Sequence, residues 1–154
     1  MDNLEVKFYD TVNDELLKFA VIISQSNGKW VFRKHKERDT YEVPGGHREA
    51  GESILETAER ELQEETGAVK FDIKSICVYS VVSKTGTNDT DEETFGLLCC
   101  AEITEFAKEL HSEIEKVVLM DELPKNWTYP LIQPRLIEKY LQIKNNSVIK
   151  TTVT

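Results

Sequence analysis

Three glutamates near the middle of the chain have the residue type and the spacing to bind a metal ion. Glu61, Glu64 and Glu65 stand at i, i+3 and i+4, so on a helix their carboxylates share one arc. Carboxylate oxygens suit a hard divalent cation such as Mg²⁺, which keeps several waters and is usually shared with substrate phosphates. The same spacing also describes a solvated acidic face, where like-charge pairs cost roughly 0.2–0.5 kcal/mol each. On helix spacing alone the solvated face is the commoner outcome. The residues on either side of the glutamates are therefore needed to choose between a metal site and a solvated face.

The residues around these glutamates complete a longer pattern. Five residues separate Gly46 from Glu52, and seven more separate Glu52 from Arg60. After Arg60 the chain continues with Glu61, Leu62, Glu64, Glu65 and Gly67, in that order. This stretch resembles the signature box of the Nudix hydrolases at every charged and glycine position. Ala68 stands where that family prefers Leu, Ile or Val, at a position that serves packing rather than chemistry.

The resemblance implies how a metal site would be built and used. Glu61, Glu64 and Glu65 would bind Mg²⁺ or Mn²⁺ together with the main-chain carbonyl of Gly45. Glu61 would also take or orient the proton of the attacking water.

It also implies supporting roles outside that set. Arg60 would hold the carboxylates in place, paired with Glu52. Family members often use a further glutamate beyond the box, and Glu113 and Glu115 are the nearest candidates here. For each of these two, an ordinary solvated side chain is the alternative.

The reaction implied by the resemblance is metal-dependent hydrolysis of a nucleoside diphosphate linked to another group. The window at residues 82–86 lacks the proline and the tyrosine that mark the ADP-ribose and dinucleoside polyphosphate subfamilies. This favours the MutT-like branch, whose enzymes convert a nucleoside triphosphate, including 8-oxo-dGTP, to the monophosphate and pyrophosphate. Two other classes stay open: an enzyme that removes diphosphate from the 5′ end of RNA, and a non-catalytic nucleotide sensor with the same fold.

Two further clusters are candidates for substrate contacts. Arg33, Lys34 and Arg38 form a basic stretch ahead of the glycines and could balance charge on the leaving phosphate, with Arg38 favoured. The alternative for this stretch is a solvated strand end. Asn126 and Trp127 could recognise the base by an amide and an aromatic platform, and their alternative is a hinge that packs the last helix onto the core.

Composition sets the limits of these interpretations. The chain has 154 residues, 40% hydrophobic and 31% charged, which predicts a single domain over residues 1–154. A formal net charge of −9 argues against binding of long nucleic acid, because the summed field repels a polyanion. Three cysteines without C-x-x-C spacing, no signal peptide and no membrane-length apolar stretch predict a cytoplasmic protein without a membrane partner, either a monomer or a homodimer.

The apolar pattern predicts a mixed α/β domain (α+β), and the resemblance implies a Nudix-type mixed β-sheet sandwiched between helices. Strands are expected at residues 4–9, 19–23, 29–32, 69–82, 94–103 and 117–120. A capping box predicts a helix over residues 54–66 with Gly67 as its C-terminal cap. Its buried side chains are expected to be Ile54, Leu55, Ala58 and Leu62. A turn is expected at Gly45 and Gly46, a second helix at residues 131–143 with Pro130 in its first turn, and a loose tail at residues 145–154.

Overall fold

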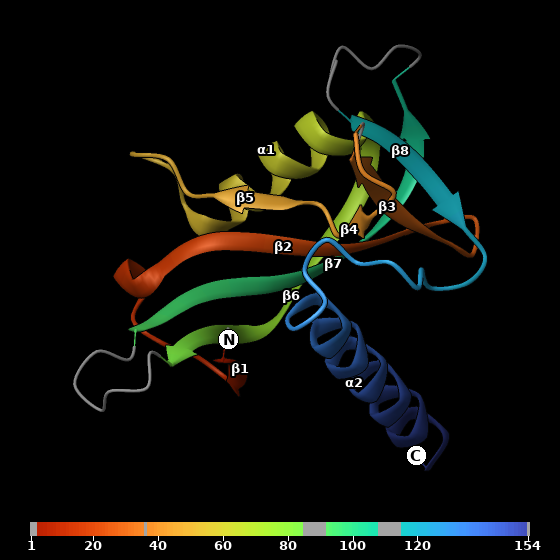
Figure 1. The fold of residues 1–154 in the computed structure, drawn as a ribbon. Helices are drawn as coiled ribbons and strands as arrows, with labels where there is room; N and C mark the ends of the chain where they lie inside the picture. The colour runs from red at the N-terminus through yellow and green to blue at the C-terminus, as the bar shows by residue number, and fades with distance from the viewer. Residues whose placement is uncertain (1–2, 36, 85–91, 108–114, 154) are drawn as a thin grey trace.

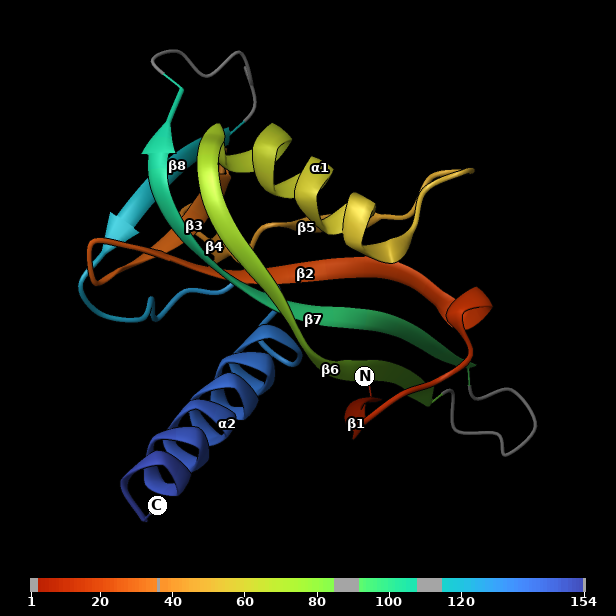
Figure 2. The same cartoon turned by 180° about the vertical axis from the view of Figure 1, so that it is seen from behind.

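The computed structural model describes residues 3–35, 37–84, 92–107 and 115–153. Within these ranges one mixed sheet of eight strands lies between two helices, α1 on one face and α2 on the other (Figures 1 and 2). Each helix covers its own cluster of buried apolar side chains. The predicted fold class is therefore confirmed. No helix in the described ranges is long and apolar enough to cross a membrane.

The elements follow the predicted order, with longer strands than the apolar runs alone indicated. The strands are β1 (Asn3–Tyr9), β2 (Leu17–Ser26), β3 (Lys29–His35), β4 (Tyr41–Glu42), β5 (Gly45–His47), β6 (Ala68–Lys84), β7 (Glu92–Phe106) and β8 (Glu115–Met120). The helices are α1 (Ile54–Thr66) and α2 (Gln133–Val153), with a short 3₁₀ turn, η1, at Asp14–Leu16. The sequence also predicts a polar loop at residues 83–91; Ser83 and Lys84 belong to β6 instead, and residues 85–91 lie outside the described residues.

The sheet runs in the order β1-β6-β7-β2-β3-β4, with β5 paired to β2 and β8 paired to β3. The β2–β3 hairpin is antiparallel and turns at Asn27 and Gly28, which have φ of 51° and 78°. β2 and β7 are parallel, with Ile22 opposite Cys99, so the sheet is mixed, as expected. These two strands lie in the middle of the sheet, between the two helices.

Helix α1 begins and ends where the sequence predicts. Glu56 N donates to Ser53 Oγ (3.1 Å), Ser53 N donates to Glu56 Oε1 (2.8 Å), and Gly67 closes the helix with φ of 75°. One predicted core residue is wrong, because Leu55 is 44% exposed. The buried side instead shifts along the helix, from Thr57 near its start to Thr66 at its end.

The two glycines before α1 form a strand rather than the predicted turn. Gly45 and Gly46 belong to β5, pair with Val21 and Ala20 of β2, and are not among the residues with positive φ. Their lack of a side chain matters for close approach. A Cβ on Gly45 would lie 2.5 Å from the Ala20 carbonyl oxygen, and a Cβ on Gly46 would lie 2.5 Å from each carboxylate oxygen of Glu61.

Helix α2 differs from its prediction at both ends. Residues 130–132 form a turn and the helix starts at Gln133, so Pro130 precedes the helix. The helix continues to Val153, so the loose tail predicted at residues 145–154 is wrong for all of its described part. No glycine or proline follows Ile143 to stop the helix. The C-terminal half of α2 extends away from the sheet (Figure 1).

Candidate active site

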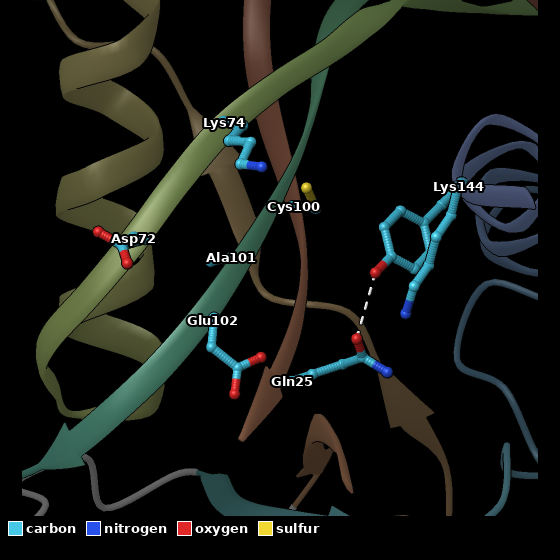
Figure 3. A pocket seen from close by; sticks show the side chains of 8 residues that line it. Gln25, Asp72, Lys74, Cys100, Ala101, Glu102 and Lys144 are labelled. Carbon is cyan, nitrogen blue, oxygen red and sulfur yellow. Dashed lines mark hydrogen bonds between the residues drawn. The ribbon is translucent and has the colours of Figure 1, made fainter. Parts of the chain in front are cut away.

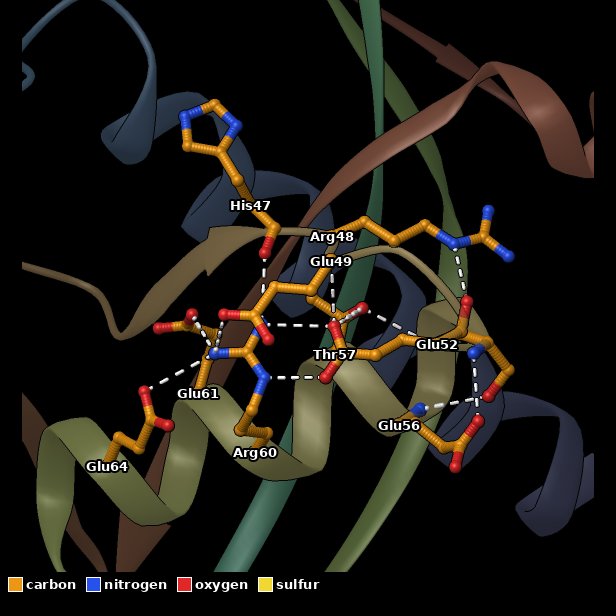
Figure 4. Close-up of polar contacts among 10 residues, drawn as sticks. His47, Arg48, Glu49, Glu52, Glu56, Thr57, Arg60, Glu61 and Glu64 are labelled. Carbon is orange, nitrogen blue, oxygen red and sulfur yellow. Dashed lines mark hydrogen bonds and ion pairs between the residues drawn. The ribbon is translucent and has the colours of Figure 1, made fainter.

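Glu61 and Glu64 of α1 and Glu52 of the preceding loop contact one guanidinium, that of Arg60 (Figure 4). Arg60 donates from Nε to Glu52 Oε2 (2.5 Å) and from Nη2 to the His47 carbonyl oxygen (3.0 Å). Its Nη1 donates to Glu61 Oε1 (2.7 Å) and is 3.3 Å from Glu64 Oε2. The predicted pairing of Arg60 with Glu52 is thus present. The loop and the helix are fixed to each other through this side chain.

Glu52 is held on both of its carboxylate oxygens. Besides Arg60, its Oε1 accepts from the Thr57 hydroxyl (2.9 Å) and from the backbone amide of Glu49 (2.9 Å). Hydrogen bonding to Arg60, followed by that to Glu49, lowers the pKa of Glu52 to about 2. Glu52 is therefore a permanent anion at neutral pH, and it keeps the guanidinium of Arg60 in position.

The loop is also attached to the start of the sheet by Arg48. This side chain donates from Nε to the Glu52 carbonyl oxygen (2.8 Å) and from Nη1 to the Asp14 carbonyl oxygen (2.9 Å). Its Nη2 donates to the Asp14 carboxylate (2.9 Å). Arg48 thereby connects the loop before α1 to the segment between β1 and β2.

The three predicted metal ligands occupy different environments. The side chains of Glu61 and Glu65 are 13% and 14% exposed, whereas that of Glu64 is 60% exposed. Glu65 Oε1 accepts from the Gly45 amide (2.7 Å), and its Oε2 contacts Arg33 Nη1. Burial raises the pKa of Glu65 to about 7, against the opposite effect of the Gly45 amide and Arg33. Burial also raises the pKa of Glu61.

The carboxylates of Glu61, Glu64 and Glu65 are suitable ligands for a hard divalent cation, but they do not converge on one point. Among the described residues, no three His, Cys, Asp or Glu side chains are grouped as a metal site. Like charges repel, and here each carboxylate of the set contacts an arginine instead. Burial of two negatively charged carboxylates, with raised pKa values, is the kind of environment that a cation stabilises.

A cleft of about 450 Å³ opens beside these carboxylates, on the face of the sheet that α2 covers. Four of its lining residues also contact or adjoin the carboxylate set: Arg33, Glu42, Gly45 and Gly46. Glu61 and Glu65 therefore lie next to residues of this cleft, although neither of them lines it.

The interior of the cleft combines an aromatic wall with polar groups. The Phe19 ring lies 5.4 Å from the Tyr79 ring and 6.3 Å from the His47 ring, and a Cβ on Gly96 would collide with it. Gln133, at the start of α2, is 6% exposed and its Oε1 accepts from the Val43 amide (2.8 Å). Such a wall suits a flat ring, and the amide of Gln133 can supply directional contacts.

The predicted substrate residues divide between this cleft and other places. Arg33 lines the cleft, while Arg38 is exposed in the segment after β3. Trp127 packs edge-on against Phe32 at 5.5 Å, and the Asn126 carbonyl accepts from the Tyr41 amide (2.9 Å). Trp127 and Asn126 thus join the last segment to the core, which is the alternative reading of this pair. Neither lines the cleft.

Several residues of the site were missed in the sequence. Glu42, Tyr79 and Gln133 line the cleft, and the only local signal for any of them is the charge of Glu42 between two apolar neighbours. Glu113 lies outside the described residues. Glu115 is the first residue of β8, and the position of its side chain is not described.

A second hollow, of about 320 Å³, lies between the sheet and α2 and shares no lining residue with the cleft (Figure 3). Tyr140 donates there to Gln25 Oε1 (3.2 Å). Lys74, Lys144, Asp72 and Glu102 all line it, so the charges of its walls offset one another. Nothing in its geometry connects it to the carboxylates of α1.

Comparisons with known proteins agree with the fold and the site. The model of the NUDIX domain family matches residues 15–140. The chain is 31% identical over 126 residues to "Putative 8-oxo-dGTP diphosphatase YtkD" of Bacillus subtilis (strain 168), which covers 81% of this chain and 75% of that protein. The chain therefore belongs to the Nudix family and is a Nudix hydrolase with pyrophosphohydrolase activity.

Solved structures show the same relationship. The crystal structure of the Bacillus subtilis pyrophosphohydrolase BsRppH (E68A mutant) has a TM-score of 0.74 and 26% identity, and covers 94% of this chain and 92% of that one. A NUDIX hydrolase from Nitrosomonas europaea, 21% identical with a TM-score of 0.57, covers 82% of this chain and 89% of that one and shares the fold. Nudix hydrolases act on small nucleotides and generally use divalent metal ions.

Proposed function

We propose that this enzyme hydrolyses a nucleoside triphosphate, including an oxidised one such as 8-oxo-dGTP, to the monophosphate and pyrophosphate. The reaction would use Mg²⁺ or Mn²⁺ held by Glu61, Glu64 and Glu65 with the Gly45 carbonyl. The three cysteines are free, which fits the reducing cytoplasm that we propose as its compartment.

One observation carries the proposal: the buried carboxylates adjoin one end of the aromatic cleft. Glu65 hydrogen-bonds the Gly45 amide, and Gly46 leaves room for the Glu61 carboxylate. A nucleoside stacked on Phe19 would therefore extend its phosphates over β5 to α1.

The residues of the chain would divide the chemical work. A bound divalent cation would supply neutralisation of the phosphate charge and an activated water. Glu61, whose pKa burial raises, would take or orient the proton of that water. Arg60 and Glu52 would keep Glu61 in position, since all three guanidinium nitrogens of Arg60 and both carboxylate oxygens of Glu52 are engaged. Arg33 would balance phosphate charge at the wall of the cleft.

Base recognition would come from the cleft rather than from Asn126 and Trp127. Phe19 offers a ring to stack on, and Gln133 offers an amide that Val43 already holds in one orientation. An amide can donate to a keto oxygen and accept from an amino group. The ring of Phe19 and the amide of Gln133 together favour a base that carries such groups. We infer that Gln133 replaces Asn126 as the base-reading amide.

A panel of nucleotides tests the proposal. Purified protein is incubated with Mg²⁺ or Mn²⁺ and 8-oxo-dGTP, dGTP, ATP, ADP-ribose or a triphosphorylated RNA oligonucleotide, and the released pyrophosphate and phosphate are measured separately. We expect pyrophosphate from a nucleoside triphosphate, lost in Glu64→Gln and retained in Glu59→Gln, an exposed glutamate on the same helix. A preference for the RNA would instead identify an enzyme of RNA 5′ ends. Hydrolysis that is absent throughout, or unchanged in Glu64→Gln, would contradict the proposal.

A further inference from the structure

Arg33, a largely buried arginine, contacts the carboxylate set and also lines the cleft. Arg33, on β3, contacts Glu65 of α1 through Nη1, and the same nitrogen lies 3.0 Å from Glu42 Oε1 on β4. The three side chains are 12%, 14% and 11% exposed, in the order Arg33, Glu65, Glu42. One guanidinium nitrogen therefore bridges two carboxylates with little water between them.

Both carboxylate oxygens of Glu65 are already engaged. Oε1 accepts from the Gly45 amide, and Oε2 faces Arg33. A cation that takes Glu65 as a ligand would have to compete with one of these donors. The amide is fixed by the pairing of β5 with β2, whereas the guanidinium sits at the end of a long side chain. Arg33 is thus the partner that can give way.

Glu42 gives the guanidinium a second attachment. It lines the cleft together with Arg33 and lies on the neighbouring strand, where the two residues are paired in register. Loss of the contact to Glu65 would leave Arg33 held by Glu42 at the cleft wall. A guanidinium in that place can donate to phosphate oxygens.

We propose that Arg33 is the counter-ion of Glu65 in the cation-free protein, and that a divalent cation displaces it while Glu42 keeps it at the cleft wall to receive the substrate's phosphates. The inference rests on the proposed function, because it takes Glu65 as a ligand of the cation. Its consequence is that the cation and the nucleotide favour each other's binding.

The affinity for the cation alone tests this displacement. Calorimetric titration of Mg²⁺ and of Mn²⁺ into wild type, Arg33→Gln and Arg135→Gln compares equal losses of charge, since Arg135 is exposed on α2. Removal of a buried, charged competitor should tighten binding in Arg33→Gln by roughly tenfold. Arg135→Gln should bind as wild type does. Equal or weaker binding in Arg33→Gln overturns the inference, and binding to neither wild type nor Arg33→Gln overturns the proposed metal site with it.

A second measurement needs no variant, in case Arg33→Gln does not fold. Crystal structures of the wild-type protein with and without Mg²⁺ would show the side chain directly. We expect Arg33 to contact Glu42 and Glu65 without Mg²⁺, and Glu42 alone with Mg²⁺ bound. A contact between Arg33 and Glu65 that persists beside the bound ion would overturn the displacement even if the metal site itself is correct.

Discussion

Two arginines hold glutamates of this site. Arg60 with Glu52, Glu61 and Glu64 forms the rim cluster, and Arg33 with Glu42 and Glu65 forms the interior cluster. The pKa of Glu52 in the first is lowered, whereas that of Glu65 in the second is raised. Arg60, at the rim of α1, lowers the pKa of Glu52 to about 2. Arg33, in the interior, contacts Glu65, and yet the pKa of Glu65 rises to about 7 because burial outweighs its hydrogen bonds and ion pair. The two pairs differ in their contacts: Arg60 donates two hydrogen bonds to Glu52, which also accepts from Glu49 and Thr57, whereas Arg33 reaches Glu65 through one nitrogen and burial is the dominant influence on Glu65.

This difference suggests that the rim cluster is a fixed scaffold, whereas the contacts of the interior cluster can rearrange. At the rim, the charged form of Glu52 is stabilised and its arginine stays in place through the reaction. In the interior, Glu65 is stabilised too little by its arginine to offset its desolvation. A carboxylate in that condition gains most from a stronger cation. The predictions below test this contrast, starting with the largest effect.

Loss of the rim arginine should have the largest effect on activity. Arg60→Gln leaves Glu52 and Glu61 without their shared donor and frees the loop at His47. Removal of such an orienting partner typically costs about 10–100-fold, so we expect kcat/KM to fall toward the upper end of that range. Arg60→Lys should recover little, because an ammonium cannot reproduce the fork. Steady-state kinetics on the preferred nucleotide measure this, and a rate within twofold of wild type would show that the rim is not a scaffold.

A methyl group at Gly46 should displace Glu61, a partner of Arg60, without meeting either arginine itself. In Gly46→Ala the new Cβ meets the carboxylate of Glu61, which must move. We expect the affinity for Mg²⁺ to fall by roughly tenfold. Gly96→Ala is the matched change on the cleft side, where the new Cβ meets the Phe19 ring. It should raise KM for the nucleotide and leave the affinity for Mg²⁺ unchanged; the reverse result would place Glu61 away from the cation.

The rim cluster could be predicted from the sequence because its contacts are local. Arg60 and Glu52 are eight residues apart in one loop and helix. The capping box, Gly67 and the i, i+3, i+4 spacing fix the helix and its phase. Each of these signals acts within a few turns, so their sum placed the carboxylates correctly on one helix.

The interior could not be predicted in the same way, because sheet register brings it together. Arg33 meets Glu42 by strand pairing, and Gln133 meets Val43 across 90 residues. A basic stretch in the sequence does not show which of its residues faces a buried glutamate. The glycines teach a related point: their presence at residues 45 and 46 was informative, but only the fold showed that close approach, and not a turn, requires them.

The stability of the cation-free protein should depend on pH in opposite ways for the two clusters. Glu52 has its folded pKa lowered from 4.5, so its contribution is present above pH 4.5 and is lost as the pH falls toward 2. Glu65 has its folded pKa raised, so the folded state binds its proton more tightly, and stability is lost as the pH rises from 4.5 through 7.

Urea unfolding in a chelating buffer separates these two slopes. Relative to wild type, Glu52→Gln should be less stable at pH 6 and approach wild type at pH 3. Glu65→Gln should gain stability relative to wild type between pH 5 and pH 8. If the free energy of unfolding changes with pH in the same way in both variants, the distinction between the rim and the interior is wrong.

The smallest effect should come from the apolar side chain that faces out at the rim. The apolar pattern gives Leu55 and Leu62 equal places in the core, but Leu55 is 44% exposed and Leu62 is fully buried. Leu62→Ala should lower the free energy of unfolding by about 2–5 kcal/mol, since it removes buried methyl groups and leaves a cavity. Leu55→Gln should change it by about 0.5 kcal/mol or less, as surface substitutions do. A large loss in Leu55→Gln would mean that other residues pack against the first turn of α1 from outside.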